Sequence, residues 1–156
     1  MKSGIGTCGI QVGDLQVAAI VAVNACGNVV DYETNELLAG VYDSHSGSVL
    51  KAQDVLFQQM DALRKLPEGN TTIGCFVTNA KLDKAQCTKI AGIAHNGYAR
   101  AIHPVHTMSD GDSIFVLSSG EVEVMADAVG MLATEMMAKA IKRAVLHAES
   151  AYGYRP

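Results

Sequence analysis

Two adjacent threonines at the start of an apolar run are the residues of this sequence best suited to chemistry. Pro67 ends a helix-like segment, Glu68-Gly69-Asn70 predicts a turn, and Thr71 and Thr72 then open the apolar run. A threonine hydroxyl is a weak nucleophile and needs a base. A chain break between Asn70 and Thr71 would place an α-amine, with a reference pKa of ~7.7–8.0, on the residue that carries the hydroxyl. We therefore predict that Thr71 first cuts its own chain and then cuts substrates.

The elements around these threonines indicate a mixed α/β protein. Runs rich in β-branched residues predict strands, and apolar residues at helical spacing predict helices. We expect strands over residues 3–12, 15–23, 71–77 and 113–118, and helices over residues 51–66, 84–102 and 124–152. Gly13-Asp14 predicts a hairpin turn, Asp83 an N-cap, and Gly120 the end of the last strand. We expect residues 31–48 and 105–112 to be loops, and Thr71 and Thr72 can also simply open a strand.

One face of the predicted sheet lacks a cover. The nearly continuous apolar run from Leu15 to Val23 is typical of a strand that is buried on both faces. The three predicted helices can cover one face of the sheet, and an apolar sheet face needs a cover. Glycines in the first strand, among them Gly6, predict a close backbone approach there. We expect a partner chain or an upstream segment to cover the second face.

Composition and charge argue against several classes of function. The 156 residues fit one domain, 1–156, and contents of 49% hydrophobic and 18% charged residues are those of an ordinary globular protein. A net charge of -4 and an aromatic content of 5% argue against a nucleic-acid partner and against a polybasic membrane contact. The apolar run over residues 17–23 is too short to span a bilayer. The amino-terminal residues lack the apolar core of a signal peptide, so we expect a cytoplasmic protein with reduced cysteines.

Other residue groups suggest alternatives. His103 and His106 flank Pro-Val, but two histidines without a clustered third ligand make a weak zinc site, and we expect neither metal nor cofactor. Ser109, His106 and Asp110 could form a hydrolytic triad, although near neighbours in one short loop seldom converge in that geometry. The methionines of the last predicted helix favour a core or a subunit interface, namely Met125, Met131, Met136 and Met137.

Several ordered motifs together resemble one enzyme family. They are Met1-Lys-Ser-Gly-Ile-Gly-Thr7, Ala18-Ala-Ile-Val-Ala-Val-Asn-Ala-Cys-Gly27, Asn70-Thr-Thr-Ile-Gly74, Thr78-Asn-Ala-Lys-Leu-Asp-Lys-Ala-Gln86, Ala94-His-Asn-Gly-Tyr-Ala-Arg-Ala-Ile102 and Pro104-Val-His-Thr-Met-Ser-Asp-Gly-Asp-Ser-Ile-Phe115. The set resembles the L-aminopeptidase/D-esterase family, the DmpA-like and β-aminopeptidase enzymes. The resemblance implies an α/β (α+β) sandwich with αββα layers, as in N-terminal-nucleophile hydrolases. It also implies self-cleavage and release of N-terminal residues from small peptides, amides or esters.

The resemblance implies roles for individual residues. Thr71 corresponds to the nucleophile, Asn70 to the residue before the cut between 70 and 71, and Asn24 to an oxyanion donor. Losing one such donor typically costs ~10²–10³ in rate. Asp110 and Asp112 could hold the new ammonium group and orient Thr71, where the family often has a Ser and a Glu. On spacing alone, Asn24 and Asp110-Gly-Asp112 are turn residues.

The resemblance also implies that the sandwich is incomplete here. Family members usually carry a substantial segment upstream of the equivalent of Ser3, so we expect this chain to be the C-terminal part of a larger fold. We expect a homo-oligomer or an upstream partner segment. Two functions stay open: a self-processing aminopeptidase that uses Thr71, and a non-catalytic fragment or assembly subunit that retains the fold.

Overall fold

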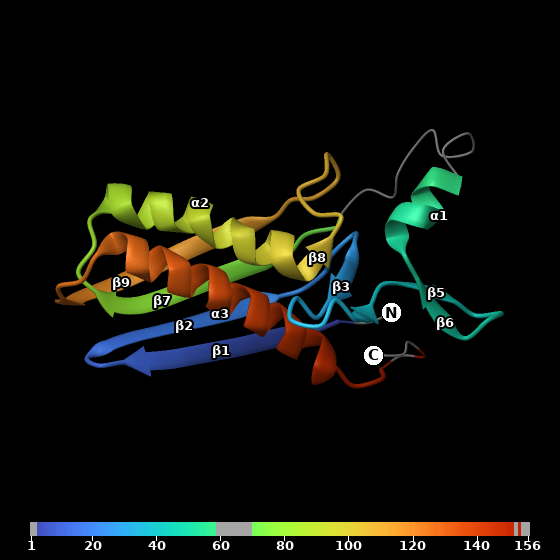
Figure 1. Ribbon diagram of the computed structural model, residues 1–156, viewed down its shortest axis with the longest axis horizontal. Helices are drawn as coiled ribbons and strands as arrows, with labels where there is room; N and C mark the ends of the chain where they lie inside the picture. Colours follow the sequence, from blue (N-terminus) through green and yellow to red (C-terminus); the bar gives the residue numbers. More distant parts are fainter. Residues whose placement is uncertain (1–2, 59–69, 152, 154–156) are drawn as a thin grey trace.

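The computed structural model describes residues 3–58, 70–151 and 153, and its centre is a four-stranded sheet with two helices on one face (Figure 1). The strands, in spatial order, are β1 (Ile5–Val12), β2 (Leu15–Ala22), β7 (Ile73–Ala80) and β9 (Ser113–Val122). Strands β1, β2 and β7 are antiparallel to their neighbours in that order, whereas β7 and β9 are parallel. The helices are α2 (Lys84–Ala101) and α3 (Ala126–Leu146). The predicted α/β fold class is confirmed.

Smaller elements lie at one end of this sheet. A three-stranded sheet has the order β4 (Leu37–Ala39), β3 (Asn28–Val30) and β8 (Ile102–His103). A hairpin of β5 (Val41–Asp43) and β6 (Ser48–Leu50) leads to α1 (Ala52–Gln58), and both lie beyond the end of the four-stranded sheet in Figure 1. The prediction of a loop over residues 31–48 is therefore wrong in part. The prediction that three helices cover one sheet face is wrong for α1.

The lengths of the predicted helices are corrected in two places. The first helix is described only as far as Gln58, so the rest of the predicted 51–66 helix lies outside the described residues. The last helix covers Ala126–Leu146 and not 124–152, because its chain turns at the C-cap His147. No helix in the described ranges is long and apolar enough to cross a membrane.

Helix α2 begins as predicted. The Asp83 carboxylate accepts the backbone N–H of Gln86, and the Gln86 side chain accepts the N–H of Asp83, which completes a capping box. From this start the helix buries Ile90, Ala94 and Tyr98 toward the sheet and α3. The cap therefore fixes where α2 begins, and with it which side of the helix carries Tyr98 toward the start of β7.

Two glycines let the helices approach their neighbours closely. A Cβ on Gly6 of β1 would lie within 1.9 Å of the Ala140 carbonyl oxygen of α3, which confirms the predicted close approach. A Cβ on Gly97 of α2 would lie 2.5 Å from the Thr134 carbonyl oxygen of α3. The glycines thus allow backbone-to-backbone packing in the layer that holds the core.

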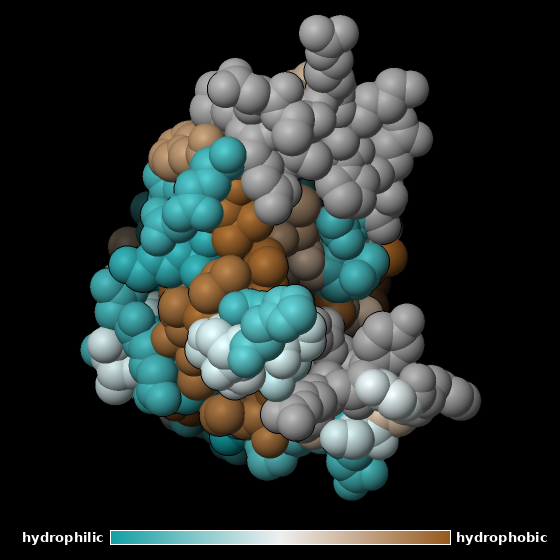
Figure 2. Space-filling model, turned by 90° about the vertical axis from the view of Figure 1, so that its right-hand side faces the viewer, coloured by the Kyte–Doolittle hydropathy of each residue, from teal (hydrophilic) through white to brown (hydrophobic). Residues whose placement is uncertain are grey.

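The other face of the four-stranded sheet is open and apolar. Residues of β2 alternate between buried and exposed, so the prediction that this strand is buried on both faces is wrong for the described chain. The side chains exposed on this face are large and hydrophobic, with exposures of 45% for Ile20, 49% for Ile73, 43% for Val77, 60% for Phe115 and 57% for Leu117. Figure 2, which views the right-hand end of the molecule in Figure 1, shows further hydrophobic surface at that end. Large exposed apolar patches are often interaction sites.

Gly120 does not end β9. It adopts a left-handed φ of 81°, and the pairing register with β7 shifts between Thr78 and Ala80, after which the strand continues to Val122. Glycine tolerates this backbone conformation, so the chain makes a local irregularity where the sequence predicted a stop.

We expect Gly97→Ala to destabilise the protein by about 1–3 kcal/mol, because its methyl group overlaps the Thr134 carbonyl and forces α2 away from α3. Gly92→Ala in the same helix is the matched control, since a Cβ there meets nothing within 4 Å. The control should be stabilised by about 0.5–1 kcal/mol through helix propensity. Urea unfolding measures both, and equal effects of the two substitutions would contradict the packing described here.

Candidate active site

The site forms where residues 70–72 run beside residues 110–112. Asn70 pairs with Asp110 in a parallel bridge, and the Ser113 N–H donates to the Thr72 carbonyl oxygen at 3.1 Å. The regular β7–β9 ladder then begins with Ile73 opposite Ser113. Strand β7 therefore starts two residues later than predicted, and the two threonines lie in an extension of its ladder.

The Asn70–Thr71 peptide bond is hydrogen-bonded on both sides. Its N–H, from Thr71, donates to the Asn24 carbonyl oxygen at 2.9 Å, and its carbonyl, from Asn70, accepts the Gly111 N–H at 3.1 Å. Asn24 follows β2, which is the neighbour of β7 on the side away from β9. The predicted residues Asn24, Asn70 and Thr71 are thus brought together, with the Asn24 contact made by its main chain.

The two threonines differ in their surroundings. Thr71 is half-buried, and its Oγ1 faces Gly111, where an added Cβ would lie 2.7 Å away. Thr72 is fully buried, and its Oγ1 has no hydrogen-bond partner among the described residues. Of the two threonines, only Thr71 is partly exposed.

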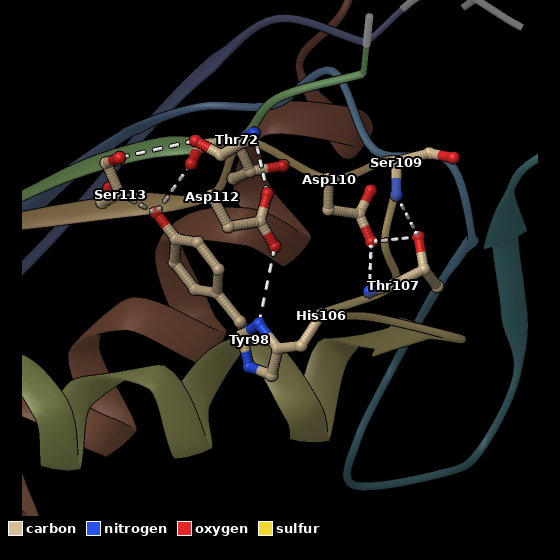
Figure 3. A network of polar contacts seen from close by, with 9 residues as sticks. Thr72, Tyr98, His106, Thr107, Ser109, Asp110, Asp112 and Ser113 are labelled. Atoms are coloured by element: carbon tan, nitrogen blue, oxygen red, sulfur yellow. Dashed lines mark hydrogen bonds and ion pairs between the residues drawn. The ribbon is translucent and has the colours of Figure 1, made fainter. Parts of the chain in front are cut away.

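Asp112 is a buried carboxylate next to this bond. Its Oδ1 accepts the Thr72 N–H at 2.9 Å, and its Oδ2 lies 3.6 Å from Nδ1 of His106 (Figure 3). The Asp112 side chain is only 6% exposed. Burial raises the pKa of Asp112, while the Thr72 N–H and the His106 ring act in the opposite direction. The carboxylate fixes the backbone immediately after Thr71.

An aromatic cluster from α2 and the 105–112 loop supports Asp112. Tyr98 stacks on His106 with ring centroids 6.4 Å apart, and His95 meets His106 edge-on at 5.0 Å. The Tyr98 hydroxyl lies 3.4 Å from the carbonyl oxygens of both Thr72 and Ser113, and burial raises the pKa of Tyr98. Burial also lowers the pKa of His95. The cluster therefore ties the starts of β7 and β9 to α2.

Asp110 organises the loop that precedes Asp112. Its Oδ2 accepts both the N–H and the hydroxyl of Thr107, at 2.8 and 2.9 Å (Figure 3). The Ser109 N–H donates to the Thr107 hydroxyl, and the imidazole of His106 faces Asp112. The alternative triad of Ser109, His106 and Asp110 is therefore not formed in this structure.

The two histidines of the alternative zinc site contact different groups. The His103 ring contacts the Ala99 carbonyl at 3.1 Å, whereas His106 contacts Asp112. Across residues 3–58 and 70–151, no three His, Cys, Asp or Glu side chains come together as metal ligands. The cysteines of the described chain are free thiols, of which Cys8 is buried and the others are partly exposed.

Three contributors to the site were not singled out from the sequence. Tyr98 was assigned to the core of α2 by its spacing, and His106 was considered only as a zinc ligand or triad member. Gly111 was treated as a turn residue between two acids. The motifs that contain them were noted, but their contacts depend on the path of the 105–112 loop, in which His106 has a left-handed φ of 56°.

Comparison with known sequences decides the family. A sequence model described as Peptidase family S58 matches residues 1–155. The chain belongs to peptidase family S58. An uncharacterized aminopeptidase of Mycobacterium leprae is 35% identical over 171 residues, which cover 98% of this chain and 47% of the relative. A 6-aminohexanoate-oligomer endohydrolase of Paenarthrobacter ureafaciens is 29% identical over 159 residues, or 91% of this chain and 44% of the relative.

Solved structures show the same fold. A β-aminopeptidase of a Burkholderia species has a TM-score of 0.57 and 23% identity, covering 92% of this chain and 41% of that one. The L-aminopeptidase D-Ala-esterase/amidase of Ochrobactrum anthropi, described as a new variant of the Ntn hydrolase fold, has a TM-score of 0.63 and 19% identity. It covers 98% of this S58 chain and 42% of that one. The chain spans about half the length of the curated relatives it matches.

We expect Asp112→Asn to be more stable than the wild type at pH 7. Because burial raises the folded-state pKa of Asp112, the wild type loses stability as the pH rises through that pKa and the carboxylate ionises. Asparagine keeps an oxygen for the Thr72 N–H without the buried charge. The midpoint of thermal unfolding should therefore be higher in the variant at pH 7, and the difference should shrink toward pH 4.

Asp31→Asn is a control of opposite sign. The Lys142 ammonium, 2.7 Å away, lowers the pKa of Asp31, so this carboxylate stabilises the protein at neutral pH and the effect is lost as the pH falls. Asp31→Asn should lower the midpoint at pH 7. A midpoint for Asp112→Asn at or below that of the wild type would contradict a pKa of Asp112 that burial raises.

Proposed function

We propose that this S58 chain is part of a self-processing aminopeptidase whose nucleophile is Thr71. In this proposal the chain is cut between Asn70 and Thr71, and the freed α-amine takes the proton of the Thr71 hydroxyl. The protein then releases N-terminal residues from small peptides, amides or esters. The observation that carries the proposal is the position of half-buried Thr71 after a peptide bond that is hydrogen-bonded at both its N–H and its carbonyl.

The polar groups around Thr71 support distinct roles in this reaction. The Asn24 carbonyl oxygen already accepts the Thr71 N–H, so it can hold the new amine after cleavage. We assign Asn24 also as an oxyanion donor through its side-chain amide, which is the type of group that supplies ~10²–10³ in rate. Asp112 holds the following residue through the Thr72 N–H. Asp110 shapes the loop that carries Asp112, so its effect on Thr71 is indirect.

The open face of the sheet supports the proposed partner. An apolar sheet face needs a second layer, and the chain spans about half the length of its relatives. We propose that the remaining part of the family's length supplies that layer, which completes the αββα sandwich. Homo-oligomers and a cytoplasmic location stay predictions.

A second candidate is a non-catalytic subunit that retains the fold. The observation that favours it is the same open face, because an isolated half of a sandwich has an incomplete substrate site. The two candidates differ in whether the chain cuts itself once the sandwich is complete. They are therefore separated by the mass of the chain and by hydrolysis of a substrate.

We expect the full-length wild-type protein to show two fragments that meet at Asn70 and Thr71 in denaturing mass spectrometry. Thr71→Ala should remain one intact chain, because it lacks the attacking hydroxyl. Thr71→Ser keeps a hydroxyl and should cut. Thr72→Ala is the matched control, since its Oγ1 has no hydrogen-bond partner within the described part of the chain, and it should cut like the wild type.

Turnover is tested next with an amino-acid p-nitroanilide. Its hydrolysis should fall by ~10³-fold or more in Thr71→Ala and persist in Thr72→Ala. Intact wild-type protein without turnover would instead support the non-catalytic subunit. A Thr71→Ala protein that still cuts at the same bond would overturn the assignment of Thr71.

We expect Phe115→Lys to destabilise the full-length protein by about 3 kcal/mol or more, because it buries an unpaired ammonium group between the proposed layers. Met131→Lys is the control, since Met131 is 73% exposed on α3 and lies outside the open sheet face. It should change stability by less than about 0.5 kcal/mol. Equal tolerance of both substitutions in urea unfolding would show that the face is not covered.

A further inference from the structure

We propose that the backbone N–H of Gly111 stabilises the oxyanion that forms on the Asn70 carbonyl during self-cleavage. We also propose that residue 111 is a glycine because the Thr71 hydroxyl needs the space beside it. This inference rests on the proposed self-cleavage and adds a catalytic group to it. Both parts start from contacts that Gly111 makes with the two residues of the bond to be cut.

The self-cleavage step is an acyl shift from nitrogen to oxygen. The Thr71 Oγ attacks the carbonyl carbon of Asn70, and the carbon–nitrogen bond between Asn70 and Thr71 breaks. The proton of the hydroxyl ends on the departing nitrogen, which becomes the α-amine of Thr71. Water then hydrolyses the ester, giving the Asn70 carboxylate and restoring the Thr71 hydroxyl. Neither an oxidant nor a reductant is required.

During this step negative charge collects on the carbonyl oxygen of Asn70. The Gly111 N–H is already 3.1 Å from that oxygen, so the donor needs no rearrangement when the charge develops. On the other side of the bond, the Asn24 carbonyl accepts the Thr71 N–H and keeps the departing nitrogen in place. Hydrogen bonds thus hold the bond at the oxygen that becomes charged and at the nitrogen that becomes an amine.

Backbone conformation does not account for a glycine at position 111. Gly111 does not have the left-handed φ found at Gly13, Gly47 or Gly120. The surroundings do account for it, because a Cβ would lie 2.7 Å from Thr71 Oγ1 and 3.6 Å from Thr71 Cγ2. A side chain at this position would push the hydroxyl away from the carbonyl that it attacks.

Two substitutions separate the N–H from the space. Gly111→Ala adds a methyl group and keeps the donor. Gly111→Pro adds a Cβ at the same place, removes the N–H and puts its ring Cδ where the hydrogen was, so glycolic acid at position 111 is the variant that removes the N–H without added bulk. The time course of cleavage at Asn70–Thr71 is followed by denaturing mass spectrometry on freshly made full-length protein. Gly111→Ala should cut more slowly than the wild type, and Gly111→Pro should cut ~100-fold more slowly again.

Hydroxylamine identifies which step is blocked, because it cleaves an accumulated ester and leaves an amide intact. If the Gly111 N–H acts on the first step, hydroxylamine should not release fragments from Gly111→Pro. Equal cleavage rates in Gly111→Pro and Gly111→Ala would overturn the role of the donor. Unchanged cleavage in Gly111→Ala would overturn the role of the space.

The thermal midpoint and the far-ultraviolet circular dichroism of each variant are measured to check that it folds. If Gly111→Pro does not fold, glycolic acid at position 111 replaces the N–H by oxygen without added bulk, and the same ~100-fold loss is expected. Failure of the inference is distinct from failure of the proposed function. If the wild-type protein never cuts at Asn70–Thr71, self-cleavage itself is refuted. If the wild type cuts and the glycolic-acid variant cuts equally fast, only the role of the Gly111 N–H as oxyanion donor is refuted.

Discussion

The parallel pairing of β7 with β9 is the constraint on which the site depends. Parallel strands keep a fixed register, and here that register extends backward beyond β7 to Asn70 and Asp110. It delivers the Gly111 N–H to one side of the Asn70–Thr71 bond, while the end of β2 delivers Asn24 to the other. The Thr71 hydroxyl, the Asn70–Thr71 peptide bond and a buried acid are thus brought together by the pairing of the two strands.

The buried acid adds a cost that the rest of the fold must offset. Asp112 is almost fully buried, and among the described residues its second oxygen has no hydrogen-bond partner and lies 3.6 Å from the His106 ring. Ionising a carboxylate in such a buried place costs free energy. The hydrogen bond from the Thr72 N–H offsets part of this cost and fixes the backbone directly after Thr71. The aromatic cluster around Tyr98 then holds this acid against α2.

The sequence was most informative where a pattern extends over many residues. The long strands and α2 follow from periodicity, and the cap at Asp83 follows from residue type. The strands of three residues within 31–48 have no period to read, so they were predicted as loop. Gly120 was predicted to end β9 because a glycine can either stop a strand or bend it, and only the neighbouring strand decides which.

For the site, the residue types could be predicted but their pairing could not. Thr71, Asn24 and the two acids were named from their motifs, yet the division of labour between Asp110 and Asp112 depends on how one loop folds. That loop turns Asp110 toward Thr107 and Asp112 toward Thr72. The role of Gly111 lies in its backbone and in the absence of a side chain, which no pattern of side-chain types expresses.

The most direct test of the account is to locate the covalent bond that the protein forms with a substrate. A β-lactone or a slowly hydrolysed amino-acid ester is incubated with the full-length protein, and tandem mass spectrometry maps the acyl group. The account predicts an adduct on the Thr71 oxygen, in a fragment whose first residue is Thr71. An adduct on another side chain, or on Thr71 within an uncut chain, would contradict it.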